Sequence, residues 1–124
     1  MNSFKEQYLE LALKYASFEK QGFETTPVVK SEVTKNVRKA NAMRDKLDKI
    51  CKLAKDEGYL NDINEFMSHE DKYIRCVTAM YCLFTDPNMA EKVLEELLEL
   101  PKPNRVGANA FTILEVWKKG LLKL

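Results

Sequence analysis

The sequence of 124 residues has little glycine, little proline and no long apolar run. Its four glycines and four prolines provide few positions for the tight turns that many short strands require, which argues against a β-sandwich or a β-barrel. The longest unbroken apolar stretches are a few residues, far below the roughly 20 that a membrane-spanning helix needs. The amino terminus also lacks a basic segment followed by a continuous apolar one. We therefore expect no membrane span, no export signal and a location in the cytoplasm.

Cysteine is scarce as well. Cys51, Cys76 and Cys82 are odd in number, and none has a partner at C-x-x-C spacing. This pattern favours neither a disulfide framework nor a zinc site. Because free cysteine often packs as a small apolar side chain, we interpret the three as buried, reduced thiols.

The single histidine gives little support to an enzyme. His69 stands beside Glu70 and Asp71, and such a run can in principle bind a metal ion or relay a proton. It lacks the second histidine that H-E-x-x-H places one helical turn away as a metal ligand. Capping of a helix by Asp71 or Ser68, with His69 exposed, is the simpler interpretation. The sequence also has no G-x-S-x-G and no Gly-rich phosphate loop. It predicts no enzyme, no cofactor and no metal site.

What the chain does contain is apolar residues at steps of three and four, the pattern of amphipathic helices. Ser3 and Glu6 form a capping box that begins a first helix. This helix is predicted to end within residues 19–21, before Gly22.

The second predicted helix is long. Thr26 and Pro27 supply a capping hydroxyl and a proline at the first helical position, and the apolar pattern continues to Glu57, before Gly58. At 1.5 Å per residue this helix would be about 46 Å long, which is longer than a domain of this size is wide. A bend, or a later start within residues 31–34, would resolve the mismatch, and the sequence leaves both open.

The rest of the chain divides into shorter amphipathic segments. Polar clusters and prolines separate predicted helices over residues 60–67, 73–84, 87–98 and 106–121. No segment alternates with period two, so no strand is predicted. Short connections make successive helices antiparallel. We therefore predict one all-α domain over residues 1–124, with five or six helices arranged as stacked antiparallel hairpins.

Residues 66–79 resemble the inter-helix turn and the second helix of a HEAT repeat. In such repeats an acidic residue is followed by a β-branched residue, an arginine and small apolar positions. The matching residues are Asp71, Ile74, Arg75 and Ala79. The resemblance implies that Arg75 pairs with Asp71, one turn away, and makes the turn rigid.

More of the chain is similar to a group of small bacterial proteins with a HEAT-like, armadillo-type fold and no assigned activity. The shared features are the order of the helices, an asparagine in the long helix and a closing Ala-x-x-x-Leu-x-x-Trp helix. They correspond here to Ala40-Asn41 and to Ala110, Leu114 and Trp117. The likeness covers most of residues 1–121. It implies a HEAT-like right-handed α-superhelix that serves as a binding scaffold, and it carries no catalytic residue onto this chain.

The charges nearly cancel, with 20 basic and 19 acidic residues, but they are unevenly distributed. Residues 27–55 include nine basic and three acidic side chains, whereas residues 56–100 include three basic and eleven acidic ones. Such asymmetry indicates charged partners even where the net charge is small.

A basic face is predicted on the second helix, opposite its apolar stripe. It consists of Lys35, Arg38, Lys39, Lys46 and Lys49. These cations could contact the phosphates of a nucleic acid, although no aromatic residue or glycine is interleaved with them and the sequence pI is about 7.6. The alternative is a solvated face that Asp45 and Asp48 partly neutralise.

An acidic surface is predicted on the fifth helix and on the turn that precedes the fourth. Like charges at i and i+4 destabilise an isolated helix, so local stability does not explain them. The residues are Glu91, Glu95, Glu96 and Glu99, together with Glu70 and Asp71. They suit a basic partner protein, and the alternative is that they only keep the protein in solution.

The combined prediction is a non-catalytic protein-binding module whose partner is another protein of basic character. By analogy with small bacterial immunity proteins, the partner would be a toxin that the module neutralises. The second hypothesis is a nucleic-acid-binding helical domain that uses the basic second helix.

Overall fold

The computed structural model describes residues 3–23, 30–102 and 104–124, and this part of the chain is all-helical, with six helices and no strand. The elements are α1 (Phe4–Phe23), α2 (Lys30–Glu57), the 3₁₀ helix η1 (Leu60–Ser68), α3 (Lys72–Cys82), α4 (Pro87–Leu98) and α5 (Arg105–Lys118). The predicted all-α class is confirmed. Among the described segments, no helix combines the length and the apolar content that a bilayer crossing needs.

The first helix begins at its predicted signal and ends later than predicted. The Glu6 amide donates to Ser3 Oγ at 3.2 Å, as a helix cap requires. α1 then continues through Gly22 to Phe23, past the predicted end within residues 19–21. The predicted cap at residues 26–27 lies outside the described residues.

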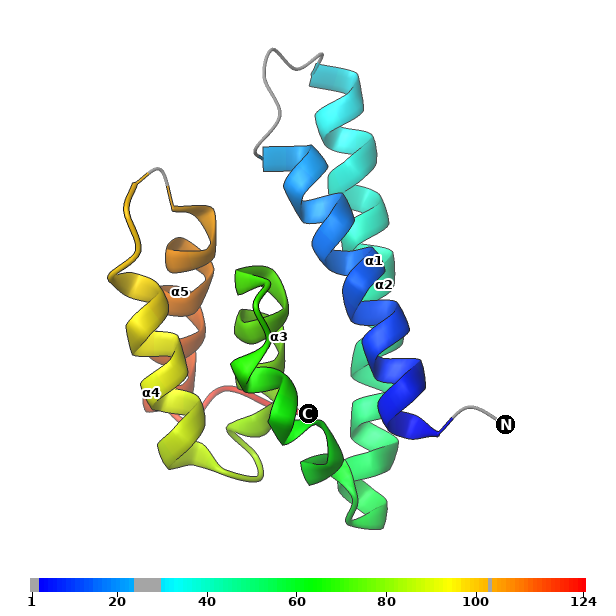
Figure 1. Ribbon diagram of the computed structural model, residues 1–124, viewed down its shortest axis with the longest axis vertical. Coiled ribbons are helices and arrows are strands. Elements are labelled where there is room, and N and C mark those ends of the chain that lie inside the picture. The colour runs from blue at the N-terminus through cyan, green and yellow to red at the C-terminus, as the bar shows by residue number, and fades with distance from the viewer. Residues whose placement is uncertain (1–2, 24–29, 103) are drawn as a thin grey trace.

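α2 is one uninterrupted helix of 28 residues. It ends at Gly58, whose φ of 86° lies in the left-handed region that favours glycine. A start at Lys30 shortens the helix to about 42 Å. Figure 1 shows that its first turns extend beyond the other helices, which is how a helix of this length is accommodated without a bend.

Successive helices run antiparallel, and α3 lies between the α1–α2 pair and the α4–α5 pair (Figure 1). α1 packs along α2, α3 contacts η1 and α4, and α5 packs on α4. The arrangement agrees with stacked antiparallel hairpins. A right-handed superhelix stays a prediction.

The core is centred on α3, whose residues are almost all buried because other helices surround it. Thr78 is a fully buried polar residue of this helix, and its hydroxyl forms a 2.7 Å hydrogen bond with that of Tyr8 on α1. The Tyr8 ring stacks on Phe66 at 6.0 Å and meets Tyr81 edge-on at 6.2 Å between ring centroids. These contacts join α1, η1 and α3 into one hydrophobic core.

Side-chain caps fix the α4–α5 pair. Asp86 accepts from the Met89 amide at 3.3 Å and begins α4. Asn104 accepts from the Gly107 amide and donates to the Leu97 carbonyl, both at 2.8 Å. One asparagine therefore begins α5 and holds it to the end of α4.

Candidate functional site

The turn that carries Glu70 and Asp71 is held together by polar contacts. Asp71 begins α3, and its Oδ1 accepts from the Tyr73 amide at 2.8 Å, as predicted for a cap. Its other oxygen forms an ion pair with Lys20 on α1. Burial raises the pKa of Asp71, but the bonds from Lys20 and Tyr73 outweigh it and lower the pKa below the usual 3.8. Asp71 is therefore engaged inside the molecule and contributes little to an outer surface.

Two expectations about this turn are wrong. Arg75 forms no ion pair with Asp71; its guanidinium donates instead to the carbonyls of His69 and Glu70, at 2.9 Å each. His69 is half-buried rather than exposed, and its Nδ1 accepts from the Asp71 amide at 2.9 Å. Backbone groups thus provide the rigidity that was expected from a carboxylate.

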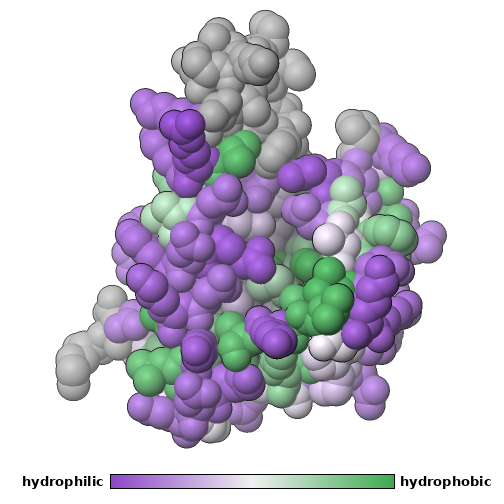
Figure 2. All heavy atoms as spheres, turned by 180° about the vertical axis from the view of Figure 1, so that it is seen from behind, coloured by the Kyte–Doolittle hydropathy of each residue, from purple (hydrophilic) through white to green (hydrophobic). Residues whose placement is uncertain are grey.

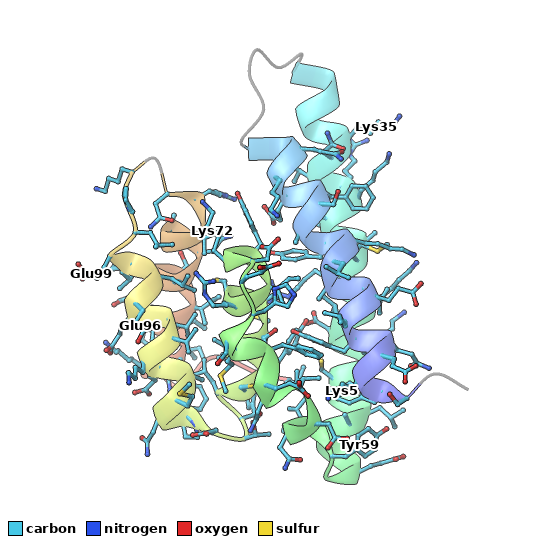
Figure 3. All side chains as sticks on the ribbon, in the orientation of Figure 1. Lys5, Lys35, Tyr59, Lys72, Glu96 and Glu99 are labelled. Atoms are coloured by element: carbon cyan, nitrogen blue, oxygen red, sulfur yellow. The ribbon has the colours of Figure 1, made fainter. Side chains whose placement is uncertain are left out.

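The acidic residues of α4 fall into two groups. Glu91 is half-buried, and its Oε1 accepts from the indole of Trp117 at 2.8 Å, which corrects the prediction that it is exposed. Glu95, Glu96 and Glu99 are exposed, and Figure 3 shows Glu96 and Glu99 on the outer side of α4. None of these three forms an ion pair within the described residues. Together with the exposed Glu70, they are the part of the predicted acidic surface that is available to a partner; we call this set of four the acidic set.

The five predicted cations of α2 are all exposed, and we call them the basic set: Lys35, Arg38, Lys39, Lys46 and Lys49. Within the parts of the chain described, none of them forms an ion pair. The ammonium of Lys39 lies 5.5 Å from the centroid of the Phe18 ring. Figure 3 places Lys35 on the opposite side of the molecule from Glu96 and Glu99.

Asp45 and Asp48 neutralise the basic set less than expected. Asp48 is turned toward α3, where it accepts from the Tyr81 hydroxyl, and it pairs with Arg44 at 3.5 Å. Asp45 is exposed among the basic set, and the Asp48 side chain is about half-exposed while it makes these inner contacts.

A cleft of about 490 Å³, which the sequence did not predict, lies where α1, α2, α3 and α5 meet. Its polar lining includes Tyr15 and Glu19 of α1, Asn41 and Arg44 of α2, and Arg105, Asn109 and Thr112 of α5. Its apolar lining includes Val77 and Met80 of α3 and Ile113 and Val116 of α5. The α3 residues are buried and Asn41 and Thr112 are exposed, so α3 forms the base and α2 and α5 form the rim.

Glu19 is the unusual residue of this cleft. Its side chain is buried, with 8% of the residue exposed, and its Oε2 has no hydrogen-bond partner among the described residues. Burial of the Tyr15 hydroxyl, and after it the negative charge of Glu19, raise the pKa of that tyrosine, which therefore stays neutral. The sequence held a signal for this residue: Glu19 continues the buried positions Tyr8, Ala12 and Tyr15 at steps of four and three.

Arg44 faces the same cleft with incomplete hydrogen bonding. Its terminal nitrogen lies 2.7 Å from Met80 Sδ, and its Nε lies 3.5 Å from Asp48 Oδ1 without the geometry of a hydrogen bond. Burial lowers the pKa of Arg44, but Tyr81 and Asp48 more than offset this and raise it, so the guanidinium is charged.

Other reactive groups are few. The three cysteines are free and buried, as predicted, and burial raises the pKa of Cys76 and of Cys82 to about 12 each. The described residues contain no group of three or more side chains suited to a metal ion.

Comparisons with protein families, with curated proteins and with solved structures found no match to this chain. The functional assignment therefore depends on the arrangement of its own residues.

Proposed function

We propose that this protein is a non-catalytic, HEAT-like protein-binding module of the cytoplasm. Its partner is a basic protein, which contacts Glu70, Glu95, Glu96 and Glu99. The observation that supports this most directly is that these four carboxylates are exposed and form no ion pair within the described residues. A partner's lysines and arginines would meet them without first breaking an internal contact, and opposite charge also accelerates the encounter.

The test is affinity capture with three forms of the protein. The wild type should retain a basic protein from a lysate, and the variant Glu95→Gln, Glu96→Gln, Glu99→Gln should bind that purified protein about tenfold more weakly at low salt. A matched control removes three exposed acidic groups elsewhere, at Asp56, Glu57 and Asp62. It should change the affinity less than about twofold. Equal losses in both triple variants, or capture of no basic protein, would contradict the proposal.

A narrower form of the proposal is that the partner is a toxin and that the module is an immunity protein. An acidic surface suits a basic nuclease, whose active site has to attract phosphate. Expression of the captured partner alone should then arrest growth, and co-expression of this protein should relieve the arrest. A partner that is harmless when expressed alone would rule out this form and leave the broader one standing.

A second candidate function, binding of a nucleic acid, is favoured by one observation about the basic set. Its cations extend over 15 residues of α2, about 21 Å from first to last, and none of them forms an ion pair within the described residues. Five phosphate contacts would give duplex DNA a logarithmic salt slope of about −4.5. Fluorescence anisotropy of a labelled duplex, measured at salt concentrations from about 50 to about 200 mM, would give this slope. No binding at the lowest salt would exclude this function.

A further inference from the structure

The cleft between α2 and α5 contains a buried carboxylate oxygen that has no hydrogen-bond partner in the part of the chain that the structure describes. Leaving a charged group unsatisfied in the interior is costly, and native proteins rarely do so without a functional reason. Glu19 is more than nine-tenths buried and lines the cleft, and one of its oxygens accepts no hydrogen bond from residues 3–23, 30–102 or 104–124. A ligand that brings a hydrogen-bond donor would satisfy it.

The charged residues around the cleft indicate which charges the ligand carries. Arg44 and Arg105 line it together with Glu19, and the charge of Arg44 is partly balanced by Asp48. In the described chain no ion pair joins Glu19 to Arg44, although both face the same space. A cation alone would be repelled by the arginines, and an anion alone would leave Glu19 Oε2 without a donor. A molecule that carries both charges matches both groups.

The remaining lining sets the ligand's size and body. Val77 and Met80 at the base and Ile113 and Val116 on α5 give the cleft an apolar wall, and its volume of about 490 Å³ is within the usual range for small-molecule sites. On the face seen from behind, Figure 2 shows a hydrophobic area near the middle of the molecule between hydrophilic flanks.

We propose that this cleft binds a small zwitterion with an apolar body, namely an apolar amino acid or dipeptide. Its ammonium group donates to Glu19 Oε2, its carboxylate faces Arg44 and Arg105, and its side chains pack against Val77 and Met80. The site is separate from the acidic set and does not depend on the proposed protein partner.

The first experiment measures binding of L-leucine, L-phenylalanine and L-leucyl-L-leucine by calorimetry. Two blocked probes, N-acetyl-L-leucine and L-leucinamide, each lack one of the two charges. At least one zwitterion should bind at millimolar or lower concentration, at least about tenfold more tightly than either blocked probe, because a buried group left unpaired penalises the wrong ligand. Absence of binding by all three zwitterions, in which case the cleft holds only water, would overturn the proposal. Equal binding of the blocked probes would also overturn it.

Variants then locate the site. Glu19→Gln removes the charge and preserves the shape, and should weaken binding of the zwitterion at least about tenfold. Glu10→Gln is the matched control, since Glu10 is an exposed residue of the same helix, and it should bind as the wild type does. Ala108→Trp places a large ring at an exposed position of the rim and should abolish binding without unfolding the protein. Unchanged binding in both Glu19→Gln and Ala108→Trp would place the ligand elsewhere and refute the assignment. The triple glutamine variant of α4 should retain the ligand, which distinguishes failure here from failure of the proposed function.

Discussion

The helices α2 and α4 carry opposite charges, and each divides its charged residues between an outer surface and an inner contact. On α4, Glu91 accepts a hydrogen bond from Trp117, whereas Glu95, one turn later, is exposed. On α2, Arg44 points into the cleft beside Met80, whereas Lys46 is exposed. Residues of like charge on one helix thus have different roles, because their position relative to the neighbouring helix decides which of them is available to a partner.

The largest effect should come from the turn before α3, where Asp71 is engaged and Glu70 is free. Asp71→Ala removes both the helix cap and the ion pair with Lys20, and should lower the free energy of unfolding by about 2 kcal/mol. Glu70→Ala should change it by less than about 0.5 kcal/mol, because Arg75 binds the Glu70 carbonyl and not its side chain. Urea unfolding measures both values, and similar losses would contradict the division into engaged and free carboxylates.

A smaller difference is expected between Glu91 and Glu95 on α4. Glu91→Ala leaves the Trp117 indole without its acceptor and should cost about 1 kcal/mol, whereas Glu95→Ala should cost less than about 0.5 kcal/mol. Trp117 is the only tryptophan, so its fluorescence reports the change directly. The emission should shift in the Glu91 variant alone. The same emission shift in the Glu95 variant would mean that the hydrogen bond from Trp117 does not account for the difference between Glu91 and Glu95.

A pH dependence tests the engaged carboxylate of Asp71 in the wild-type protein. Its pKa is lower in the folded state than the usual 3.8, so its contribution is fully present above that value and is lost as the pH falls through the folded-state pKa. Melting temperatures between neutral pH and strong acid should therefore fall less steeply in Asp71→Asn than in the wild type. Parallel curves would show that the charge of Asp71 does not stabilise the fold.

The fold was largely predictable from the sequence, and the cleft was not. Helix caps and steps of three and four act within one helix, so Ser3 and Asp71 could be recognised as caps from local pattern alone. The path of the turn sets the partners of Arg75, and the packing of α5 on α4 sets the partner of Glu91. Neither can be read from the local sequence pattern. Glu19 was missed for a related reason. The sequence shows a charged residue on an apolar stripe, but it does not show that four helices meet around this residue and form a cleft.

The smallest effect on stability should come from the exposed cations of α2. Lys46→Gln combined with Lys49→Gln should leave the free energy of unfolding within about 0.5 kcal/mol of the wild type, because neither side chain forms an ion pair in the described chain. The same variant should reduce the salt slope of duplex binding by about 1.8 if the basic set contacts phosphates. A stability loss above about 1 kcal/mol would mean that these cations support the fold, and they would then resemble Asp71 rather than Glu95. Unchanged stability with an altered salt slope would instead assign the outer face of α2 to a partner, since residues that the fold does not need are the ones whose charge is free to be recognised.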